Sequence, residues 1–415
     1  MINKKKVLLI QHASEFGGSV MSLLYTISGL IENHKDLELI LVLGSRNIQI
    51  ENFYKKLQIK IDTSYNIPFY NHSQAYNLNL YNPINWIIEL KRCFLIIKAF
   101  IITNKCLNKY KPDLVHLNSV VLLGSAMAVK CYKIPLIWHV RENPVNNIIN
   151  FRTNIIKLYL KRLAYKIIFI SNNDYKCWGS PKNSTIIYNF VDAKKFDKNN
   201  TTKNQYKYLE SIHTKKILFL GGVSEIKGTK ELLLSLVDLK KSNFEFTLLF
   251  PNSLYILPTS KIYKIGKIIL NLFGKLTYTQ EVESIITKYR LEQNIIRFDY
   301  ISNIEQILFY SDLLIFPSIR PHFARPIIEA QSMGVPVIAS DLEGITELID
   351  NLKTGILYDP TKITELTQAI KSIFEDNILY NTIISNARKN INLKFDQKIN
   401  VKKIYEVYEK AIATY

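Results

Sequence analysis

Short apolar runs alternate with helix-length segments along the first half of the chain, and this alternation predicts a parallel β-sheet between layers of helices. The runs are nearly continuous, without the polar residue at every second position that a half-exposed strand shows. Such strands are typical of a sheet that helices cover on both faces. The predicted strands of this half are Val7–Ile10, Leu39–Leu43, Leu114–Leu117, Leu136–Val140 and Ile167–Ile170.

The same alternation restarts after a polar stretch, residues 193–214, which is rich in Lys, Asn and Thr. With 415 residues the chain is long enough for two cores. The pattern therefore predicts an α/β protein of two Rossmann-like, doubly wound domains joined near residue 200, with a final helix from Gln397. The predicted strands of the second half are Ile217–Leu220, Phe246–Phe250, Ile295–Phe298, Leu313–Phe316 and Val335–Ala339.

Composition narrows the class of protein. A hydrophobic fraction of 47% and a charged fraction of 21% indicate a folded chain. The four cysteines form no CxxC pair, which predicts reduced, buried thiols in a cytosolic protein instead of a disulfide framework or a zinc site. The N-terminal segment is interpreted as a first strand and not as a signal peptide, and no apolar stretch approaches the roughly 20 residues of a membrane span.

The formal net charge of +19 indicates an anionic partner, although the lysines are spread along the chain. Residues 84–109 place Lys91, Lys98, Lys105 and Lys109 on one helical face among apolar residues, and residues 260–276 interleave lysines with apolar residues in the same way. Two interpretations stand: attachment to an anionic membrane leaflet, or ordinary helices with solvated lysines.

The run SIRPHFARPIIEAQSMGVPVIAS, residues 318–340, is the most informative stretch of the chain. It follows the strand Leu313–Phe316 and gives a loop and a short helix that carries Glu329. The carboxyl ends of parallel strands line the crevice where open α/β sheets bind ligands. The loop amides and the positive end of the helix suit an anion or a sugar hydroxyl.

Three other predicted strand ends carry candidate chemistry. Gly17-Gly18 precede a helix, and Gly221-Gly222 lead to Lys227; backbone without a Cβ lets a phosphate approach closely. His139 ends another buried strand and is followed by Arg141 and Glu142. Taken singly, each has a structural alternative: a turn glycine, a solvated lysine or a satisfied polar histidine.

Together these segments resemble the donor-binding signature of the family-4 retaining glycosyltransferases, the glycosyl transferases group 1 of GT-B fold. Three positions depart from the family pattern: Pro321 stands where a first glutamate is expected, Gly222 where an arginine is expected, and Phe190 where a glycine is expected. Arg325 or Arg141 is a candidate to supply the missing positive charge. In register with the family are Pro317-Ser318, Phe323, Pro326, Glu329-Ala330, Gly334 and Pro336-Val337.

The resemblance implies two domains with a cleft between them. Residues 1–200 are expected to bind the acceptor and residues 201–395 the nucleotide sugar. Residues 396–415 are expected to form a helix that packs back toward the N-terminal domain.

The resemblance also implies roles for individual residues. Glu329 is expected to accept hydrogen bonds from the donor ribose, Lys227 to neutralise the diphosphate and His139 to lie near the anomeric centre, and these three are the expected catalytic residues. Arg141 and Glu142 are expected to bind donor or acceptor. No metal or other cofactor is expected, because basic groups and helix ends would neutralise the diphosphate. The expected donor contacts are Gly17, Gly18, Gly221, Lys227, Ile301, His322, Phe323, Ala324, Arg325 and Glu329.

The function implied is retaining transfer of a sugar from a nucleoside-diphosphate sugar to a saccharide or lipid-linked saccharide, as in bacterial surface-polysaccharide synthesis. The expected location is the cytoplasm, with peripheral attachment to the inner face of the cell membrane. Two alternatives stay open, a UDP-sugar epimerase of similar fold and a non-catalytic binding subunit. A nucleic-acid binder has only the net charge in its favour, because the chain has no recognition motif.

Overall fold

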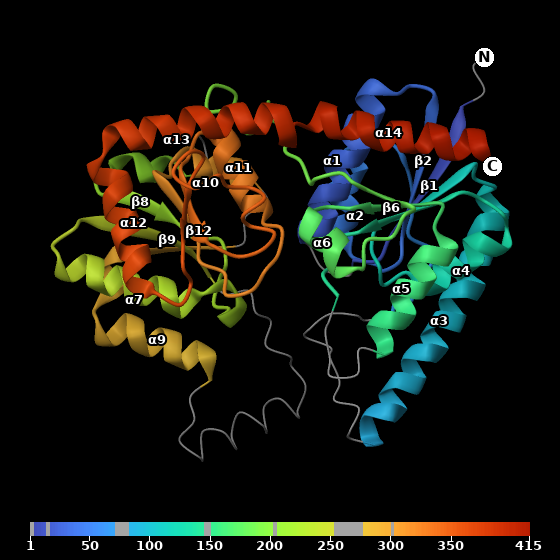
Figure 1. Ribbon diagram of the computed structural model, residues 1–415, viewed down its shortest axis with the longest axis horizontal. Helices are drawn as coiled ribbons and strands as arrows, with labels where there is room; N and C mark the ends of the chain where they lie inside the picture. Colours follow the sequence, from blue (N-terminus) through green and yellow to red (C-terminus); the bar gives the residue numbers. More distant parts are fainter. Residues whose placement is uncertain are drawn as a thin grey trace. The chain divides into compact units, whose positions relative to one another are not determined.

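The computed structural model describes residues 4–13, 17–70, 83–144, 151–201, 206–252, 277–299 and 303–415. The chain forms two compact units (Figure 1). Unit 1 comprises residues 1–190 together with 394–415, and unit 2 comprises residues 191–393. Among the helices in all the residues that the structure describes, none is both long enough and apolar enough to cross a membrane.

Unit 1 is built on a seven-stranded sheet of order β3-β2-β1-β4-β5-β6-β7, in which every strand pair is parallel. The five predicted strands are present within two residues of their expected ends. Two short strands, β3 and β7, were not predicted because they lie at the sheet edges and lack a continuous apolar run. The strands are β1 (Lys5–Gln11), β2 (Leu37–Leu43), β3 (Lys60–Asp62), β4 (Leu114–Leu117), β5 (Leu136–Val140), β6 (Lys166–Phe169) and β7 (Ser184–Ile186).

Seven helices complete unit 1 within the residues described. The terminal helix α14 packs against α1, where Gly29 leaves room for it: a Cβ there would lie 2.6 Å from Val401 Cγ2. The Gln397 side-chain amide donates to the carbonyl of Tyr25 at 2.7 Å. The helices are α1 (Gly18–Asn33), α2 (Ile48–Lys55), α3 (Pro83–Tyr110), α4 (Leu123–Cys131), α5 (Phe151–Leu163), α6 (Asn172–Cys177) and α14 (Gln397–Thr414).

Unit 2 repeats the plan with a six-stranded parallel sheet of order β10-β9-β8-β11-β12-β13. The five predicted strands are again present, and the edge strand β13 was missed for the same reason as β3 and β7. The strands are β8 (Lys215–Leu218), β9 (Phe246–Pro251), β10 (Ile295–Phe298), β11 (Leu313–Phe316), β12 (Val337–Ser340) and β13 (Ile356–Tyr358). The α-helices described are α7 (Thr229–Lys241), α9 (Tyr278–Lys288), α10 (Ile304–Phe309), α11 (Arg325–Met333), α12 (Ile363–Glu375) and α13 (Asn377–Asn390).

The boundary between the units differs from the predicted one near residue 200. Unit 2 begins at Val191 because the following segment packs onto α11: Phe196 is buried, and its carbonyl accepts a hydrogen bond from Ser332 Oγ at 3.2 Å. The return to unit 1 lies between Leu393 and Lys394, two residues before the expected start of the last segment. Polar composition did not show that part of this connection packs onto α11.

Candidate functional site

Each sheet changes the direction of its strand order at one point, and most candidate residues lie at the carboxyl ends of strands at that point or of the neighbouring strand. In unit 2 this switch point lies between β8 and β11, and in unit 1 between β1 and β4. The carboxyl ends of the strands at such a switch point are where open α/β folds bind ligands.

In unit 2 the loop after β8 touches the loop after β11, and one glycine permits the contact. Gly228 has φ +70°, and a Cβ added to it would lie 1.7 Å from the carbonyl oxygen of Pro317. Ser318 Oγ and the amide of Ile319 both donate to the carbonyl of Ile226, at 3.0 and 3.1 Å. The two loops are therefore fixed to one another by the Ser318 side chain and by backbone groups, and only glycine fits at position 228.

The first of these loops also closes on itself. Thr229 Oγ1 donates to the carbonyl of Gly222 at 2.7 Å and accepts from the amide of Ser224 at 3.0 Å. A Cβ at Gly221 would meet the Phe219 ring at 2.3 Å and Lys227 Cβ at 2.8 Å. Gly221 thus keeps the loop tight around Lys227, whereas Gly222, at φ +64°, has open space where an added Cβ would lie. Thr229 carries no family signal and was not predicted.

Lys227 is held by neutral groups. Its Nζ donates to Nε2 of His322 at 2.9 Å and lies 5.2 Å from the centroid of the Phe316 ring. None of the ion pairs found in the part of the chain that the structure describes involves Lys227. Burial lowers the pKa of this lysine to about 8. A partly desolvated cation with no carboxylate partner is well suited to receive an anion.

His322 acts as the acceptor in this pair. Its Nδ1 lies 3.0 Å from the carbonyl oxygen of Arg320, to which it can only donate, so Nε2 is the free acceptor for Lys227. Burial and the neighbouring charge of Lys227 lower the pKa of His322 to about 4, so the ring is neutral at physiological pH. The backbone of His322 lies against Gly344, where a Cβ would be 3.0 Å away.

Glu329 lies in the first turns of α11, as the sequence predicts, and is buried there. Its carboxylate pairs with the guanidinium of Arg325 one turn earlier, which is also buried. Arg325 was a candidate to replace the arginine that the family has at position 222. Its positive charge is already paired with the carboxylate of Glu329. The helix begins after Ala324 with no side-chain cap and no acidic residue in its first turn, so its positive end is not neutralised there.

In unit 1 the loop after β1 leads into α1 through Gly17 and Gly18. Gly17 is extended, and a Cβ added to either glycine would meet no described atom within 4 Å. Neither packing nor backbone conformation requires glycine at these two positions. The N-terminus of α1 also has no side-chain cap. The expectation that these amides bind the donor stays a prediction.

Beside this loop, Arg141 organises the ends of β4 and β5. Its guanidinium donates to Oδ1 of Asn118 at 2.7 Å, to Oδ1 of Asn189 at 2.6 Å and to Nδ1 of His139 at 3.3 Å. Asn118 in turn donates to Gln11 at the end of β1 at 3.0 Å. Asn118 and Gln11 were not predicted as site residues, although each ends a buried strand, which is the signal that could have identified them.

The contact with Arg141 sets the tautomer of His139. A guanidinium only donates, so Nδ1 of His139 accepts and the proton of the neutral ring lies on Nε2. His139 is 2% exposed, and its Nε2 has no hydrogen-bond partner within the described chain. Burial, then the positive charge of Arg141, then His116 hold the pKa of His139 well below its usual value. His139 is thus a neutral donor at physiological pH.

Two further contacts complete this region. The carboxylate of Glu142 accepts from the hydroxyl of Ser119 and from the amide of Val120, at 3.2 Å for the amide. His116, on β4, is buried and bonded through Nδ1 to the hydroxyl of Tyr408 on α14. Burial and Arg141 lower the pKa of His116 to about 3. The structure therefore gives Glu142 a role in fixing the loop after β4, which the sequence alone did not indicate.

The structure brings most candidate residues together within their own units. The two adjoining loops of unit 2 and the start of α11 carry Gly221, Lys227, His322, Phe323, Ala324, Arg325 and Glu329. The strand ends of unit 1 carry Gly17, Gly18, His139, Arg141 and Glu142. Ile301 lies outside the described residues, as does the basic segment 260–276.

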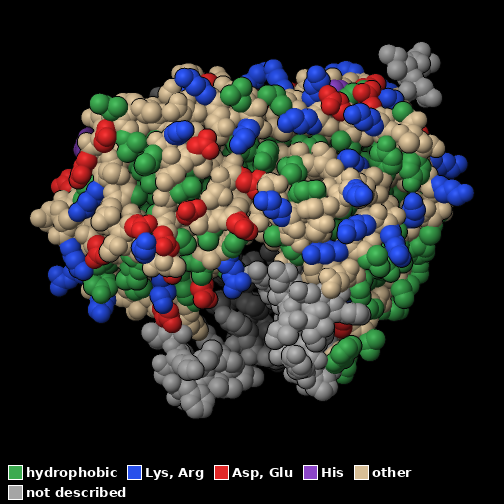
Figure 2. Space-filling view, viewed as in Figure 1, with side chains coloured by type: hydrophobic (Ala, Val, Ile, Leu, Met, Phe, Trp, Pro, Cys, Tyr) green, Lys and Arg blue, Asp and Glu red, His purple; other side chains and the backbone are tan. Residues whose placement is uncertain are grey.

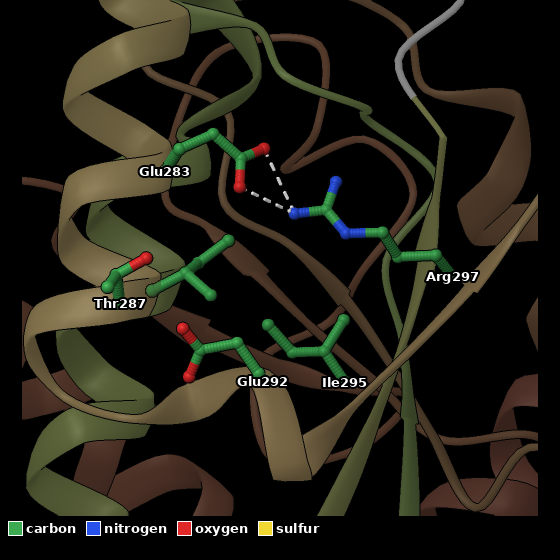
Figure 3. Close-up of a pocket in the computed structure, with 6 residues that line it drawn as sticks. Glu283, Thr287, Glu292, Ile295 and Arg297 are labelled. Carbon is green, nitrogen blue, oxygen red and sulfur yellow. Dashed lines mark hydrogen bonds and ion pairs between the residues drawn. The ribbon is translucent and has the colours of Figure 1, made fainter.

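A surface hollow in unit 2 is unrelated to these loops. It has a volume of about 430 Å³ and lies against the edge strand β10 (Figure 3). Figure 3 shows Arg297 already paired with both oxygens of Glu283, at 3.0 and 2.9 Å. The hollow is lined by Glu283, Ile286, Thr287, Glu292, Ile295 and Arg297.

Comparison with known families finds a similarity for the second unit. Residues 201–390 match the family model of the glycosyl transferases group 1. The second unit is therefore similar to the glycosyl transferases group 1. The match contains both loops that hold Lys227 and His322, and the helix that carries Glu329.

Curated relatives match over different lengths. The UDP-Gal:α-D-GlcNAc-diphosphoundecaprenol α-1,3-galactosyltransferase of Escherichia coli is 24% identical over 75% of this chain and 79% of its own. The capsular polysaccharide biosynthesis glycosyltransferase CapM of Staphylococcus aureus is 28% identical over 28% of this chain, a match that spans only 30% of CapM.

Solved structures share the fold over nearly the whole chain. A glycosyltransferase from Rickettsia africae superposes with a TM-score of 0.74 at 22% identity, covering 99% of both chains. HepE from Anabaena in complex with UDP superposes with a TM-score of 0.73 at 20% identity, covering 98% of this chain and all of HepE. The fold predicted from the alternation of strands and helices, two Rossmann-like α/β domains as in GT-B glycosyltransferases, is therefore confirmed.

Proposed function

We propose that the protein transfers a sugar, with retention of anomeric configuration, from a nucleoside-diphosphate sugar to a saccharide or lipid-linked saccharide. The observation that carries this proposal is Lys227: a partly buried cation, without a carboxylate partner among the described residues, at the switch point of the sheet in the unit that matches the group 1 family model. An anionic ligand would restore the balance of charge at that position. The diphosphate of the donor is such a ligand.

The nucleotide sugar would lie along unit 2. Lys227 and the start of α11 would face the diphosphate, the Glu329 carboxylate the ribose, and the backbone of residues 323–325 the sugar. The E. coli relative is named for a UDP-galactose donor, and HepE was crystallised with UDP, which favours a uridine nucleotide. Lys227 then provides the charge that the family assigns partly to an arginine, in whose place this chain has Gly222.

The chemistry would need no enzymic nucleophile. The bond between the anomeric carbon and the phosphate oxygen breaks, and the acceptor oxygen bonds to that carbon from the same face. The acceptor proton passes to the leaving phosphate. Lys227 stabilises the negative charge that develops on this phosphate, a group already oriented before the reaction. In unit 1, His139 carries its proton on Nε2 and is therefore a hydrogen-bond donor and not a base.

The acceptor follows from the relatives. The E. coli enzyme acts on a sugar joined to diphosphoundecaprenol, and CapM belongs to capsular polysaccharide biosynthesis. We therefore infer a saccharide on a lipid carrier as acceptor, which would place the protein at the cytoplasmic face of an anionic membrane during the reaction.

Donor binding tests the proposal directly. Melting of the purified chain is followed with UDP, GDP, CMP and UDP-sugars; a nucleotide at one hundred times its dissociation constant stabilises the folded state by about 2.7 kcal/mol. Lys227→Ala should abolish the shift, and Lys230→Ala, whose lysine pairs with Glu281 at 2.7 Å, should retain it. If no nucleoside diphosphate shifts the melting temperature, the proposed donor site is wrong.

Turnover separates the enzyme from its rivals. A UDP-sugar that binds and is transferred, with the α-anomeric signal preserved by NMR, supports a retaining transferase. Binding without transfer or donor hydrolysis, tested with saccharide and lipid-linked acceptors, supports a non-catalytic binding subunit. Conversion of the free donor to its epimer supports an epimerase.

A further inference from the structure

Helix α3 of unit 1 is fixed to the unit along one face. Its buried residues recur at helical spacing and include Arg92, Ala99, Thr103 and Cys106. It packs on α4 so closely that a Cβ at Gly124 would lie 2.3 Å from a carbonyl oxygen of α3. Thr103 and Ser125 bond to each other across this contact at 2.8 Å. The inner face of α3 is therefore buried against unit 1.

Ion pairs hold both ends of α3. Near its start, Glu89 accepts from Arg92 at 3.2 Å, from Arg152 of α5 at 2.5 Å and from the hydroxyl of Tyr70. Near its end, Lys109 pairs with Asp62 at 2.8 Å. Because these contacts fix the rotation of the helix about its axis, the outward direction of its opposite face is determined.

That opposite face is apolar. Trp86, Leu90, Phe94, Ile97 and Ile101 follow one another at intervals of three or four residues and are 51–69% exposed. At 1.5 Å per residue they form a row about 22 Å long, which we call the outer row. Figure 2 shows hydrophobic side chains gathered at the edge of the molecule where α3 lies. Single exposed apolar residues need no explanation, but a continuous row of this length does.

A second row, of lysines, runs beside the outer row. Lys91, Lys98 and Lys105 are exposed and succeed one another every seven residues, which places them along one flank of the outer row. The only acidic residue of α3 is Glu89, which is engaged with Arg92 and Arg152. The outward side of α3 thus combines apolar side chains with positive charge that no acidic residue of the helix opposes.

We propose that α3 docks on an anionic membrane surface, with its axis parallel to the bilayer plane. The outer row enters the boundary between headgroups and acyl chains, and Lys91, Lys98 and Lys105 contact anionic headgroups. The row is too short, and the lysines too frequent, for α3 to span the bilayer. The choice of a membrane as the partner rests on the proposed function, and the structure adds which helix makes the contact.

A second copy of the chain fits this face less well. In a symmetric dimer each outer row would cover its counterpart, and the lysine rows of both copies would run along the same seam without carboxylates to neutralise them. An anionic lipid surface instead complements both rows at once. With a net charge of +19 the whole chain is also attracted to such a surface.

Vesicle flotation of the full chain tests the proposal. Binding to vesicles of phosphatidylcholine and phosphatidylglycerol should be strong, and binding to phosphatidylcholine alone weak. Lys91→Gln, Lys98→Gln and Lys105→Gln together should reduce the affinity about a hundredfold, at roughly fivefold per lysine. The exposed unit 2 lysines Lys207, Lys353 and Lys389, changed in the same way, give a control of equal net charge that should lose much less.

The apolar half has its own matched pair. Leu90→Glu with Phe94→Glu should abolish flotation. Leu352→Glu with Ile378→Glu, at exposed apolar positions of unit 2, should leave flotation nearly unchanged. The fluorescence of Trp86 gives a second readout, because the other two tryptophans, Trp138 and Trp178, are fully buried. A blue shift on vesicle binding, quenched by brominated lipid, should accompany flotation.

The proposal would be overturned by no flotation with either lipid, by equal losses in the α3 and control variants, or by a Trp86 signal that does not respond to vesicles. A dimer dissociated by Leu90→Glu with Phe94→Glu would assign the row to a second copy. The vesicles contain neither donor nor acceptor, and nucleotide binding is measured on the same variants in solution. Failure of membrane docking can therefore be distinguished from failure of the proposed transfer reaction.

Discussion

The two units share one sheet topology, but the cation near each switch point, Lys227 in unit 2 and Arg141 in unit 1, has different partners. In unit 2, Lys227 donates to a single neutral ring, His322, and burial lowers its pKa to about 8. In unit 1, Arg141 donates to Asn118, Asn189 and His139, so its guanidinium holds three side chains in place. The first arrangement leaves positive charge for a ligand, and the second uses a cation as a structural centre.

This contrast follows from the chemistry of the two cations. A guanidinium presents five donors in a plane and can join several acceptors at once, whereas an ammonium group is a compact charge on a flexible stem. Removing Arg141 would leave several acceptors without a donor. Removing Lys227 would leave one imidazole nitrogen and a free place for water. The same fold edge can therefore carry a binding cation in one unit and an organising cation in the other.

The largest effect should come from Lys227→Ala. Loss of a group that stabilises developing charge reduces turnover by roughly 10²–10³-fold. The melting temperature of the free protein should stay the same or rise, because a desolvated charge is removed. Steady-state assays with a donor identified by thermal shift, together with calorimetric melting, measure both effects. Near-normal turnover would show that Lys227 is not the diphosphate cation.

Arg141→Met should give the opposite combination in unit 1. The acceptors Asn118, Asn189 and His139 would lose a common donor, which costs about 1–3 kcal/mol for each that stays unsatisfied. We expect a clear loss of stability in chemical denaturation and a weaker effect on nucleotide affinity than Lys227→Ala causes. If Arg141→Met abolished nucleotide binding without lowering stability, the distinction between the two cations would be lost.

The pH dependence sharpens the comparison. Lys227 binds an anion only when protonated, the form that predominates below its pKa of about 8. We therefore expect kcat/KM to fall about tenfold per pH unit above this value. In Lys227→Arg the guanidinium stays charged throughout, so whatever activity remains should lack this alkaline decline. An identical decline in both proteins would assign the titration to another group.

The smallest effect should come from the hydrogen bond between His116 and Tyr408. Tyr408→Phe removes the hydrogen bond between α14 and His116 and should lower stability by about 1 kcal/mol. Tyr405→Phe on the same helix, at a more exposed hydroxyl bonded to Asp36 at 2.9 Å, serves as the control and should cost less. Denaturation by urea measures both. Equal costs would mean that the buried contact adds nothing beyond an ordinary surface bond.

The sequence by itself determined ten of the thirteen described strands and their parallel pairing, because an uninterrupted apolar run between helices stays buried only inside such a sheet. It also placed Glu329 near the start of α11, since the strand Leu313–Phe316, the loop and Pro326 define that helix locally. It missed the short edge strands, where pairing with a neighbour and not apolar content makes the strand.

Only the tertiary structure decided the partners of these residues. Lys227 and His322 are 95 positions apart and meet because Gly228 lets two loops touch, and His116 and Tyr408 are 292 apart and meet because α14 returns to unit 1. The outward face of α3 was likewise undetermined until α4 and Arg152 fixed its rotation. Local pattern records which element a residue joins; charge balance, tautomer and exposure depend on neighbours that folding brings from elsewhere in the chain.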